Sequence, residues 1–317
     1  MKGARIFFAT DIHGSDRCFR KFLNAAKFYN CQILIMGGDM TGKMLIPIID
    51  EGAGKWSTRL YGRSMKVTED ELPVLRKKIA DAGFYGYETT PDEIAELNVR
   101  PGAVERLFTD KMTSTLEQWL QLAEDRLGKS GTLCYVGPAN DDPYFIDDIL
   151  ARSSTVGNPN ERLVELPEGF TMLSVGYSNI TPWDSPRELP EERLREVIDT
   201  QASRLQTFDR TIFNFHVPPK DTLLDQALLL DSELRPIMRG GSPVEAGVGS
   251  SAVRDSIRDY QPAVSLHGHI HESRGAVEIG HATAINPGSE YSEGILRGVI
   301  VALSARKGLA GYQFVSG

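Results

Sequence analysis

Asp11 and His13 stand two residues apart, directly after an apolar run at residues 5–9 that is typical of a buried β-strand. Residues two apart in an extended segment share a face, so both side chains leave the strand end together, and Gly14 lets the backbone turn away. A carboxylate and an imidazole placed in this way can bind a metal ion. Because Asp-x-His occurs by chance in many proteins, its meaning depends on partners elsewhere in the chain.

Four further apolar runs end in residues of the same kind. Residues 32–36 lead to Gly37-Gly38-Asp39, residues 132–137 to Asn140, residues 211–215 to His216, and residues 264–267 to Gly268-His269-Ile270-His271. The carboxyl ends of the strands in an α/β sheet are where such folds build their sites. Seven ligand-type residues at five predicted strand ends therefore indicate one shared metal site.

The elements that would position these residues begin with a β-α-β unit. Ser15 is a residue type that caps helices, and apolar residues recur at helical spacing from there to about residue 29. The run at 32–36 is continuously apolar, as a strand covered on both faces should be. These patterns predict an α/β fold for the core of the chain.

Residues 44–130 differ from the rest and carry no metal-ligand pattern. We predict a hairpin over 56–67, helices that begin after capping boxes at Thr68 and Thr90, and a long helix over 103–127. We interpret this stretch as an inserted, mostly helical cap whose Phe and Trp residues form a small core of its own. One domain would then span 1–317, with its core at about 1–43 and 131–317 and with 44–130 inserted in it.

The second half of the chain supplies the remaining predicted elements. Helices are expected over 191–206, 223–230 and 251–260, a flexible glycine-rich loop over 239–250, and strands over 171–175, 276–279, 282–285, 299–303 and 312–315. Such glycine-rich loops are more often plain connections than lids over a substrate. His267 and His281 are interpreted as structural residues.

The composition restricts the classes of partner. The formal net charge of −8 disfavours a protein that binds a nucleic-acid backbone, which usually requires a basic face. The three scattered cysteines indicate reduced, buried thiols, and no stretch has the length and apolarity of a membrane span. We therefore expect a cytoplasmic protein without membrane contacts; the sequence leaves its oligomeric state open.

The order of motifs resembles the calcineurin-like metallophosphoesterase superfamily. Asp11-Ile12-His13 and Gly268-His269-Ile270-His271 are the most specific parts of the resemblance, and Asn286-Pro287-Gly288-Ser289 also looks like the family's sequence at that point. The resemblance covers the core strands but not residues 44–130. It implies a two-sheet sandwich flanked by helices, with two metal ions at the sheet edge.

Carried over to this chain, the resemblance implies two sets of metal ligands. One metal would be held by Asp11, His13, Asp39 and His271, and the other by Asp39, Asn140, His216 and His269. Asp39 would bridge the two ions. This mixture of ligand types suits two divalent ions, with Mn²⁺ favoured and Fe or Zn²⁺ as alternatives. Such a pair can activate a water molecule to attack the phosphorus of a small phosphorylated substrate.

One departure from the family pattern concerns the leaving group. The family's usual third motif is Gly-Asn-His-Asp/Glu, whose His helps to protonate the leaving oxygen, whereas Asp141 stands at that position here. We expect Asp39, Asn140 and Asp141 to be the catalytic residues. Because an ionised Asp is a poor acid, none of the three would donate a proton to the leaving group. We therefore expect phosphodiesters, pyrophosphates or aryl phosphates to be better substrates than alkyl phosphomonoesters.

Other functions and contacts stay open at this point. Arg274 and Lys43 are candidates for substrate contacts, although each is equally well a surface residue. A nuclease or a protein phosphatase of the same superfamily is an alternative. A non-catalytic metal-binding scaffold with the same fold is another, but such a protein would be expected to lose ligands.

Overall fold

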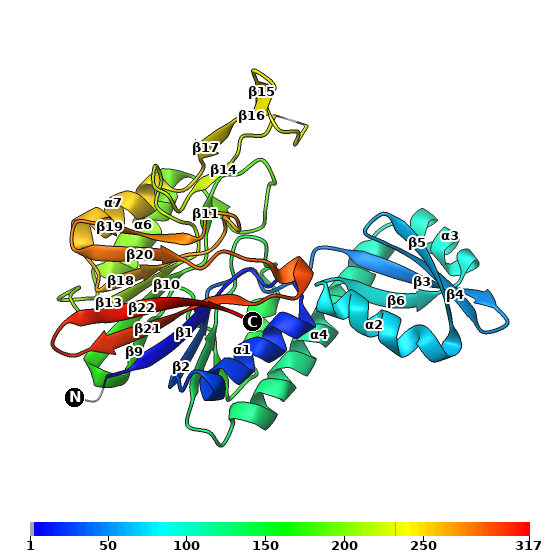
Figure 1. Ribbon diagram of the computed structural model, residues 1–317, viewed down its shortest axis with the longest axis horizontal. Helices are drawn as coiled ribbons and strands as arrows, with labels where there is room; N and C mark the ends of the chain where they lie inside the picture. Colours follow the sequence, from blue (N-terminus) through cyan, green and yellow to red (C-terminus); the bar gives the residue numbers. More distant parts are fainter. Residues whose placement is uncertain (1–2, 232) are drawn as a thin grey trace.

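The computed structural model describes residues 3–231 and 233–317, and two six-stranded sheets packed face to face form its centre (Figure 1). In spatial order the first sheet contains β22 (Gly308–Ser316), β21 (Arg297–Ser304), β1 (Arg5–Ala9), β2 (Ile33–Met36), β7 (Leu133–Val136) and β8 (Val156–Gly157). The second contains β19 (Gly275–Ile279), β20 (Ala282–Asn286), β18 (Val264–Leu266), β13 (Thr211–Phe215), β10 (Phe170–Val175) and β9 (Leu163–Leu166).

The inner strands of each sheet run parallel, and the outer strands are antiparallel except for β8, which is parallel to β7. β1, β2 and β7 are parallel neighbours in the first sheet, and β10, β13, β18 and β20 are parallel neighbours in the second. β21, β22, β9 and β19 pair in the antiparallel sense. The carboxyl ends of the parallel strands therefore lie at one edge of the sandwich, as the sequence predicted.

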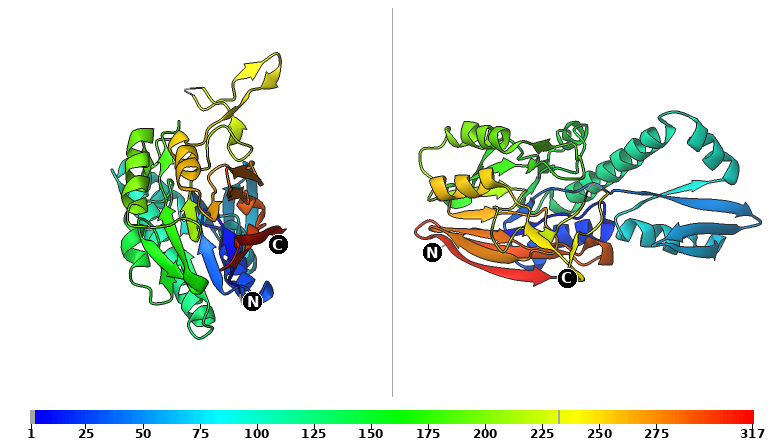
Figure 2. Two further views of the ribbon diagram at one scale, coloured as in Figure 1. Left: turned by 90° about the vertical axis from the view of Figure 1, so that its left-hand side faces the viewer. Right: turned by 90° about the horizontal axis from the view of Figure 1, so that it is seen from above.

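Helices cover the outer face of each sheet (Figure 2). α1 (Asp16–Phe28), α4 (Ala103–Leu127) and α5 (Ile146–Leu150) pack on the first sheet, and α6 (Glu191–Ala202) and α7 (Ser251–Tyr260) pack on the second. Along β1, Ile6 and Phe8 face the other sheet while Phe7 and Ala9 face the helices. Both faces of the strand are buried, which explains its continuous apolar run.

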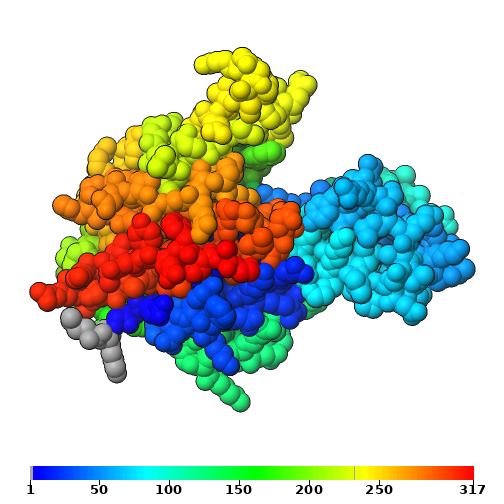
Figure 3. Space-filling model, in the orientation of Figure 1, coloured from blue at the N-terminus to red at the C-terminus, as the bar shows by residue number. Residues whose placement is uncertain are grey.

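Residues 44–130 are called the insertion, and the part of it that precedes α4 projects from the carboxyl edge as a separate lobe (Figure 3). A four-stranded sheet, in the order β5 (Arg63–Thr68), β4 (Lys55–Leu60), β3 (Leu45–Gly52) and β6 (Tyr85–Thr89), packs with α2 (Leu72–Asp81), while α3 (Pro91–Val99) contacts β3 and α4. The predicted hairpin and helices are present. Helices account for more of residues 44–130 than strands do, as expected, but β3 and β6 were not predicted, and they give the lobe a sheet of its own.

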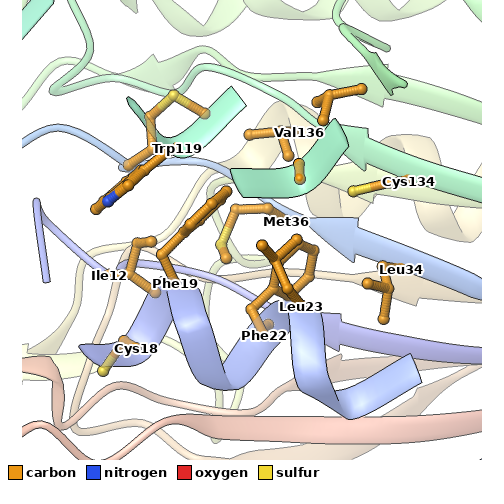
Figure 4. Packing of buried hydrophobic residues seen from close by; sticks show 14 of the residues in the cluster. Ile12, Cys18, Phe19, Phe22, Leu23, Leu34, Met36, Trp119, Cys134 and Val136 are labelled. Carbon is orange, nitrogen blue, oxygen red and sulfur yellow. The ribbon is translucent and has the colours of Figure 1, made fainter. Parts of the chain in front are cut away.

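The long helix α4 belongs to the core as much as to the insertion. Trp119 is 3% exposed and stacks on Phe19 of α1 at a centroid distance of 4.3 Å (Figure 4). Its indole N–H donates to Asp16 Oδ1 at 3.1 Å. The expectation that the Phe and Trp residues of the insertion form their own core was therefore wrong for Trp119 and for Phe108, which also packs against the main core. Trp56 and Phe84 do pack in the small core of the lobe.

The segment after β13 also differs from the sequence prediction. No helix covers 223–230; instead β14 (Gln226–Leu228) pairs with β17 (Glu245–Gly247), and β15 (Met238–Arg239) pairs with β16 (Ser242–Pro243). The Asp225 carboxylate accepts hydrogen bonds from the backbone N–H groups of Asp221, Thr222 and Gly249, which fixes a turn in place of a helix. The glycine-rich stretch is thus part of a projecting arm with two short ribbons (Figure 1).

The structure also bears on the cysteines and on helices that could cross a membrane. The three cysteines are free and buried, as predicted. Within residues 3–231 and 233–317, no helix combines the length and the apolarity that crossing a bilayer requires.

Candidate metal centre

The loops that follow β1 and β2 are bonded to each other along their backbones. The N–H groups of Asp11, His13 and Gly14 donate to the carbonyl groups of Gly38, Asp39 and Met40 at 2.8–2.9 Å. Each of these hydrogen bonds joins the loop after β1 to the loop after β2. The two short motifs that the sequence singled out are therefore held side by side by the main chain.

A buried carboxylate ties a third loop to this pair. Asp142 is fully buried, and its oxygens accept hydrogen bonds from the backbone N–H groups of Met40, Thr41 and Ala139 and from the Thr41 hydroxyl, at 2.7–3.2 Å. These contacts hold the loop after β7 against the loop after β2. Asn140 and Asp141 are thereby fixed beside Asp39, whose Oδ1 accepts the Asp141 N–H at 3.1 Å.

All seven strand-end residues converge at this edge. Asp11, His13 and His271 form one group of ligand-type atoms, and Asp39, His216 and His269 form another, with the atoms of each group within 4.8 Å of one another. Asn140 Oδ1 lies 2.9 Å from His269 Nδ1 and so joins the second group. Asp39 Oδ2 lies 3.4 Å from His216 Nε2 and 3.7 Å from His13 Nε2, between the two groups.

The backbone at this edge is strained where the ligand-type residues stand. Asp11, His13, Asp39 and His269 have φ values of 53°, 37°, 50° and 66°. Positive φ is uncommon outside glycine and persists only when the surroundings over-determine it. The loop-to-loop hydrogen bonds supply that restraint, so the side chains converge through a fixed main chain.

The imidazole contacts leave nitrogen atoms free at the centre of the cluster. His216 Nδ1 lies 3.1 Å from the Gly37 carbonyl oxygen, to which it donates, and its Nε2 is buried without a hydrogen-bond partner. His13 Nε2 and His271 Nε2 face each other at 3.1 Å. Two neutral imidazole nitrogens at this distance repel unless they share a proton or a cation, and ligands of one metal ion lie about 3 Å apart.

Burial and the carboxylates decide the protonation of these histidines. Burial lowers the pKa of His269 to about 3 and that of His13 well below its ordinary value, so both rings keep a lone pair. Burial also opposes charge on His216, but the carboxylates of Asp39 and Asp11 outweigh it and raise its pKa to about 9. Burial raises the pKa of Asp39 to about 6 against the pull of His216. The carboxylates that stabilise a proton on His216 would also stabilise a divalent cation bound at this edge.

Asp141 and Lys43 form an ion pair at the rim of the cluster. Burial alone would raise the pKa of Asp141, but the Lys43 ammonium and a 2.6 Å hydrogen bond from the Ser185 hydroxyl outweigh it and lower the pKa to about 2. The pKa of Lys43 is raised because the pull of Asp141 exceeds the effect of burial. Asp141 is thus ionised and has no proton to donate at neutral pH.

Arg274, His267 and His281 make contacts of other kinds. The Arg274 guanidinium lies over the Phe314 ring, 4.9 Å from its centroid. His267 is buried, and its Nδ1 lies 2.8 and 3.0 Å from the carbonyl oxygens of Phe215 and Val217, consistent with a structural role. His281 is exposed at the start of β20, opposite the end that faces the cluster.

Three further residues at the edge, Tyr291, Ser289 and Ser185, were not among the predicted site residues. Tyr291, at the start of the short 3-10 helix Tyr291–Glu293, places its ring 4.7 Å from the His13 ring and 5.8 Å from the His271 ring. Ser289 donates its hydroxyl hydrogen to the Asp11 carbonyl at 2.6 Å. Ser289 belongs to the Asn286-Pro287-Gly288-Ser289 run, so that resemblance pointed to it; Tyr291 and Ser185 had no such marker.

A groove of about 1130 Å³ lies between the insertion and the core. Its walls come from β4, β5 and α2 on one side and from the start of α1 and residues 292–294 on the other. None of the seven strand-end residues lines it. The groove and the candidate metal centre are therefore separate features of the molecule.

Comparison with known proteins adds one sequence relative. The chain is 29% identical over 129 residues to the uncharacterized protein MJ1162 of Methanocaldococcus jannaschii, a match that spans 40% of this chain and 52% of that protein. The match therefore covers about half the length of this curated relative. No protein-family model matches the chain.

Solved structures resemble the chain over its whole length. One crystal structure has a TM-score of 0.54 at 15% identity, and the crystal structure of TT1561 of Thermus thermophilus has a TM-score of 0.52 at 12% identity; each alignment covers 100% of this chain and 99% of the other. The phosphoesterase Yfce from E. coli aligns with 98% of each chain, but its TM-score of 0.32 is too low to bear on function.

These likenesses concern the fold. The chain shares its overall fold with these two structures; in it, two sheets lie face to face, helices cover them outside, and His and Asp residues cluster at the carboxyl edge. The two-sheet sandwich flanked by helices that the resemblance implied is thereby confirmed.

Proposed function

We propose that the chain is a dinuclear metal-dependent phosphohydrolase that acts on a phosphodiester or pyrophosphate of a small molecule. The observation that carries the proposal is the convergence of two groups of ligand-type atoms on either side of Asp39. Asp11, His13 and His271 with Asp39 would hold one ion, and Asp39, Asn140, His216 and His269 would hold the other. Mn²⁺ is the ion we favour, with Fe or Zn²⁺ as alternatives.

The chain's own residues would do the positioning. Two divalent ions bound here would neutralise phosphate charge and make a water molecule nucleophilic. Asp39 would fix the spacing between the two groups, because its carboxylate lies between His13 and His216. Lys43 would contact a phosphate oxygen, since its ammonium lies at the rim beside Asp141. Arg274 stays a more distant candidate for this role, because its guanidinium packs on Phe314.

The protonation of the rim supports the preference for diesters and pyrophosphates. Asp141 has a pKa of about 2 and therefore cannot protonate a departing oxygen at neutral pH. Substrates whose leaving groups need little protonation should react faster than alkyl phosphomonoesters.

The test is hydrolysis of an aryl phosphodiester and an alkyl phosphomonoester by metal-stripped protein to which Mn²⁺ is returned. We expect the diester to react faster, and only with metal. Asp39→Ala should lower the rate by more than about a hundredfold, because even residues that only support metal ligands contribute ten- to a hundredfold. Asp92→Ala, which removes an exposed carboxylate of α3, is the matched control and should change nothing.

Three results would contradict all or part of the proposal. Equal rates for the two esters would remove the leaving-group argument while leaving the metal centre intact. Absence of hydrolysis by protein that binds two Mn²⁺ ions would favour the scaffold alternative, whereas cleavage of nucleic acid or of phosphoproteins alone would favour the nuclease or the protein phosphatase.

A further inference from the structure

The Lys43–Asp141 ion pair lies beside the candidate metal centre, at the point where the chain leaves the core for the insertion. Lys43 lies one residue before the insertion and two before β3, and its ammonium bonds the Asp141 carboxylate. Asp141 is held from three further sides: Ser185 and the Asn140 amide donate to its Oδ1 at 2.6 and 3.0 Å, and its own N–H donates to Asp39. The carboxylate therefore has a fixed position beside the cluster.

The two members of the pair face different surroundings. Asp141 Oδ2 lies 4.0 Å from His13 Nδ1, and the Asp141 side chain is 19% exposed. The Lys43 side chain is 49% exposed, so the cation is on the solvent side and the anion is on the cluster side. An ammonium group has three donors, so Lys43 can bond Asp141 and still offer hydrogen atoms to a ligand.

A fixed anion beside the reacting group affects substrates of different charge unequally. A phosphodiester carries one negative charge on its phosphate, whereas a terminal phosphomonoester approaches two above its second pKa near 6. Each added charge on the substrate adds one further repulsion from Asp141 and one further attraction to Lys43. Because the two groups have opposite signs, removing one or the other must shift the preference in opposite directions.

We propose that the Lys43–Asp141 pair sets the charge of the phosphate group that the centre accepts, favouring a singly charged diester over a doubly charged terminal phosphate. Asp141 opposes the second charge, and Lys43 limits that opposition so that a singly charged phosphate still binds. The inference rests on the proposed function and names the substrate class for that same site. Asp141 and Lys43 then act as specificity-determining residues.

The test compares the kcat/KM of an aryl monoester with that of an aryl diester at pH 8, in Mn²⁺-loaded protein. We expect Asp141→Asn to raise the monoester-to-diester ratio about tenfold and Lys43→Gln to lower it by a similar factor. The double variant should return close to the ratio of the unmodified protein. Ser185→Ala, which loosens Asp141 without removing its charge, should raise the ratio by a smaller factor.

An ion pair within the insertion provides the matched control. Lys66 bonds Glu51 at 3.1 Å on the exposed face of the lobe, with the Lys66 side chain 79% exposed. Lys66→Gln and Glu51→Gln remove the same charges at a site away from the cluster. Neither should change the ratio, whereas a ratio that follows the total charge of the protein would change with them too.

A binding measurement makes the outcome independent of turnover. Calorimetry with inorganic phosphate and with dimethyl phosphate should give affinity ratios that shift in the same opposite directions in Asp141→Asn and Lys43→Gln. Ratios that stay constant, or that shift in one direction in both variants, would overturn the inference. If all proteins bind Mn²⁺ and none hydrolyses either ester, the proposed function fails, and the calorimetric ratios still decide the inference.

Discussion

The carboxyl edge of the sandwich and the insertion both contain non-glycine residues with positive φ, but they restrain them differently. At the edge, Asp11 and Asp39 are almost fully buried and belong to loops that hydrogen bonds join to each other. In the insertion, Ala53 and Tyr61 have φ values near 50° at hairpin turns and are exposed. The edge thus stores strain to fix side chains, whereas the lobe has only the strain that its turns require.

This contrast indicates a division of labour between the two regions. The core supplies all the ligand-type residues, because each of the seven lies outside 44–130. The insertion adds a sheet with a small core of six buried residues, Ile46, Ile48, Leu60, Leu72, Leu75 and Ile79. Substitutions at the edge should therefore affect stability and metal binding together, and substitutions in the lobe should affect only local stability.

The largest effect should come from the residue that crosses between the regions. Trp119 belongs to the insertion by sequence but is buried against Phe19 of the core, so Trp119→Ala should lower the free energy of unfolding by about 3–5 kcal/mol. Trp56→Ala, in the half-buried small core of the lobe, should cost clearly less. Urea denaturation of the two variants provides the comparison. Equal losses would mean that α4 does not link the lobe to the core.

A second comparison is between two glycines that have positive φ, Gly38 at the edge and Gly62 in the insertion. Gly38 has a φ of 125°, and an added Cβ would lie 2.2 Å from the Ala139 Cβ and 2.9 Å from His216 Nδ1. Gly38→Ala should therefore cost about 2–3 kcal/mol and weaken Mn²⁺ binding at least about tenfold by displacing His216. Gly62 has a φ of 73° with no atom within 4 Å of an added Cβ, so Gly62→Ala should cost only about 1 kcal/mol.

Calorimetric titration with Mn²⁺ separates the two glycine variants. Gly62→Ala should bind the ion as the unmodified protein does, because its strain is confined to a hairpin turn. If Gly38→Ala kept full affinity for Mn²⁺, the close packing of the β2 loop against β7 and His216 would not be needed to position the ligands.

The same contrast explains what the sequence could predict. The edge was predictable because buried parallel strands give continuous apolar runs, and each run ends in a ligand-type residue, as at Ala9-Thr10-Asp11. β6 was missed because Tyr85-Gly86-Tyr87-Glu88-Thr89 is short, contains Gly and becomes a strand by pairing with β3.

Tertiary contacts account for the remaining differences. The apolar run at 223–230 has the length of a helix or a strand, and the hydrogen bonds of Asp225 with a loop 24 residues later decide between them. Ser185 reaches Asp141 across 44 residues, and Tyr291 reaches His13 from the far end of the chain. Such partners depend on the folded arrangement of the loops, so no local pattern in the sequence marks them.

The smallest expected effect compares two helix caps. Thr90 caps α3 in the insertion, where its hydroxyl accepts the Glu93 N–H at 3.2 Å and the Glu93 side chain accepts the Thr90 N–H at 2.8 Å. Thr90→Ala should cost about 1 kcal/mol, without a change in metal binding or turnover.

Ser15 caps α1 two residues after His13 and is fully buried. Its hydroxyl accepts the Cys18 N–H at 3.3 Å and donates to the Asp81 carbonyl at 2.6 Å, which joins the start of α1 to the end of α2. Ser15→Ala should cost about 2 kcal/mol, because it removes a cap and leaves a buried carbonyl without its donor. Amide hydrogen exchange should show local opening at α3 in Thr90→Ala, but at the His13 loop in Ser15→Ala. If Thr90→Ala and Ser15→Ala lowered the free energy of unfolding equally, and each opened only its own helix, the cap of α1 would have no special role in holding the His13 loop.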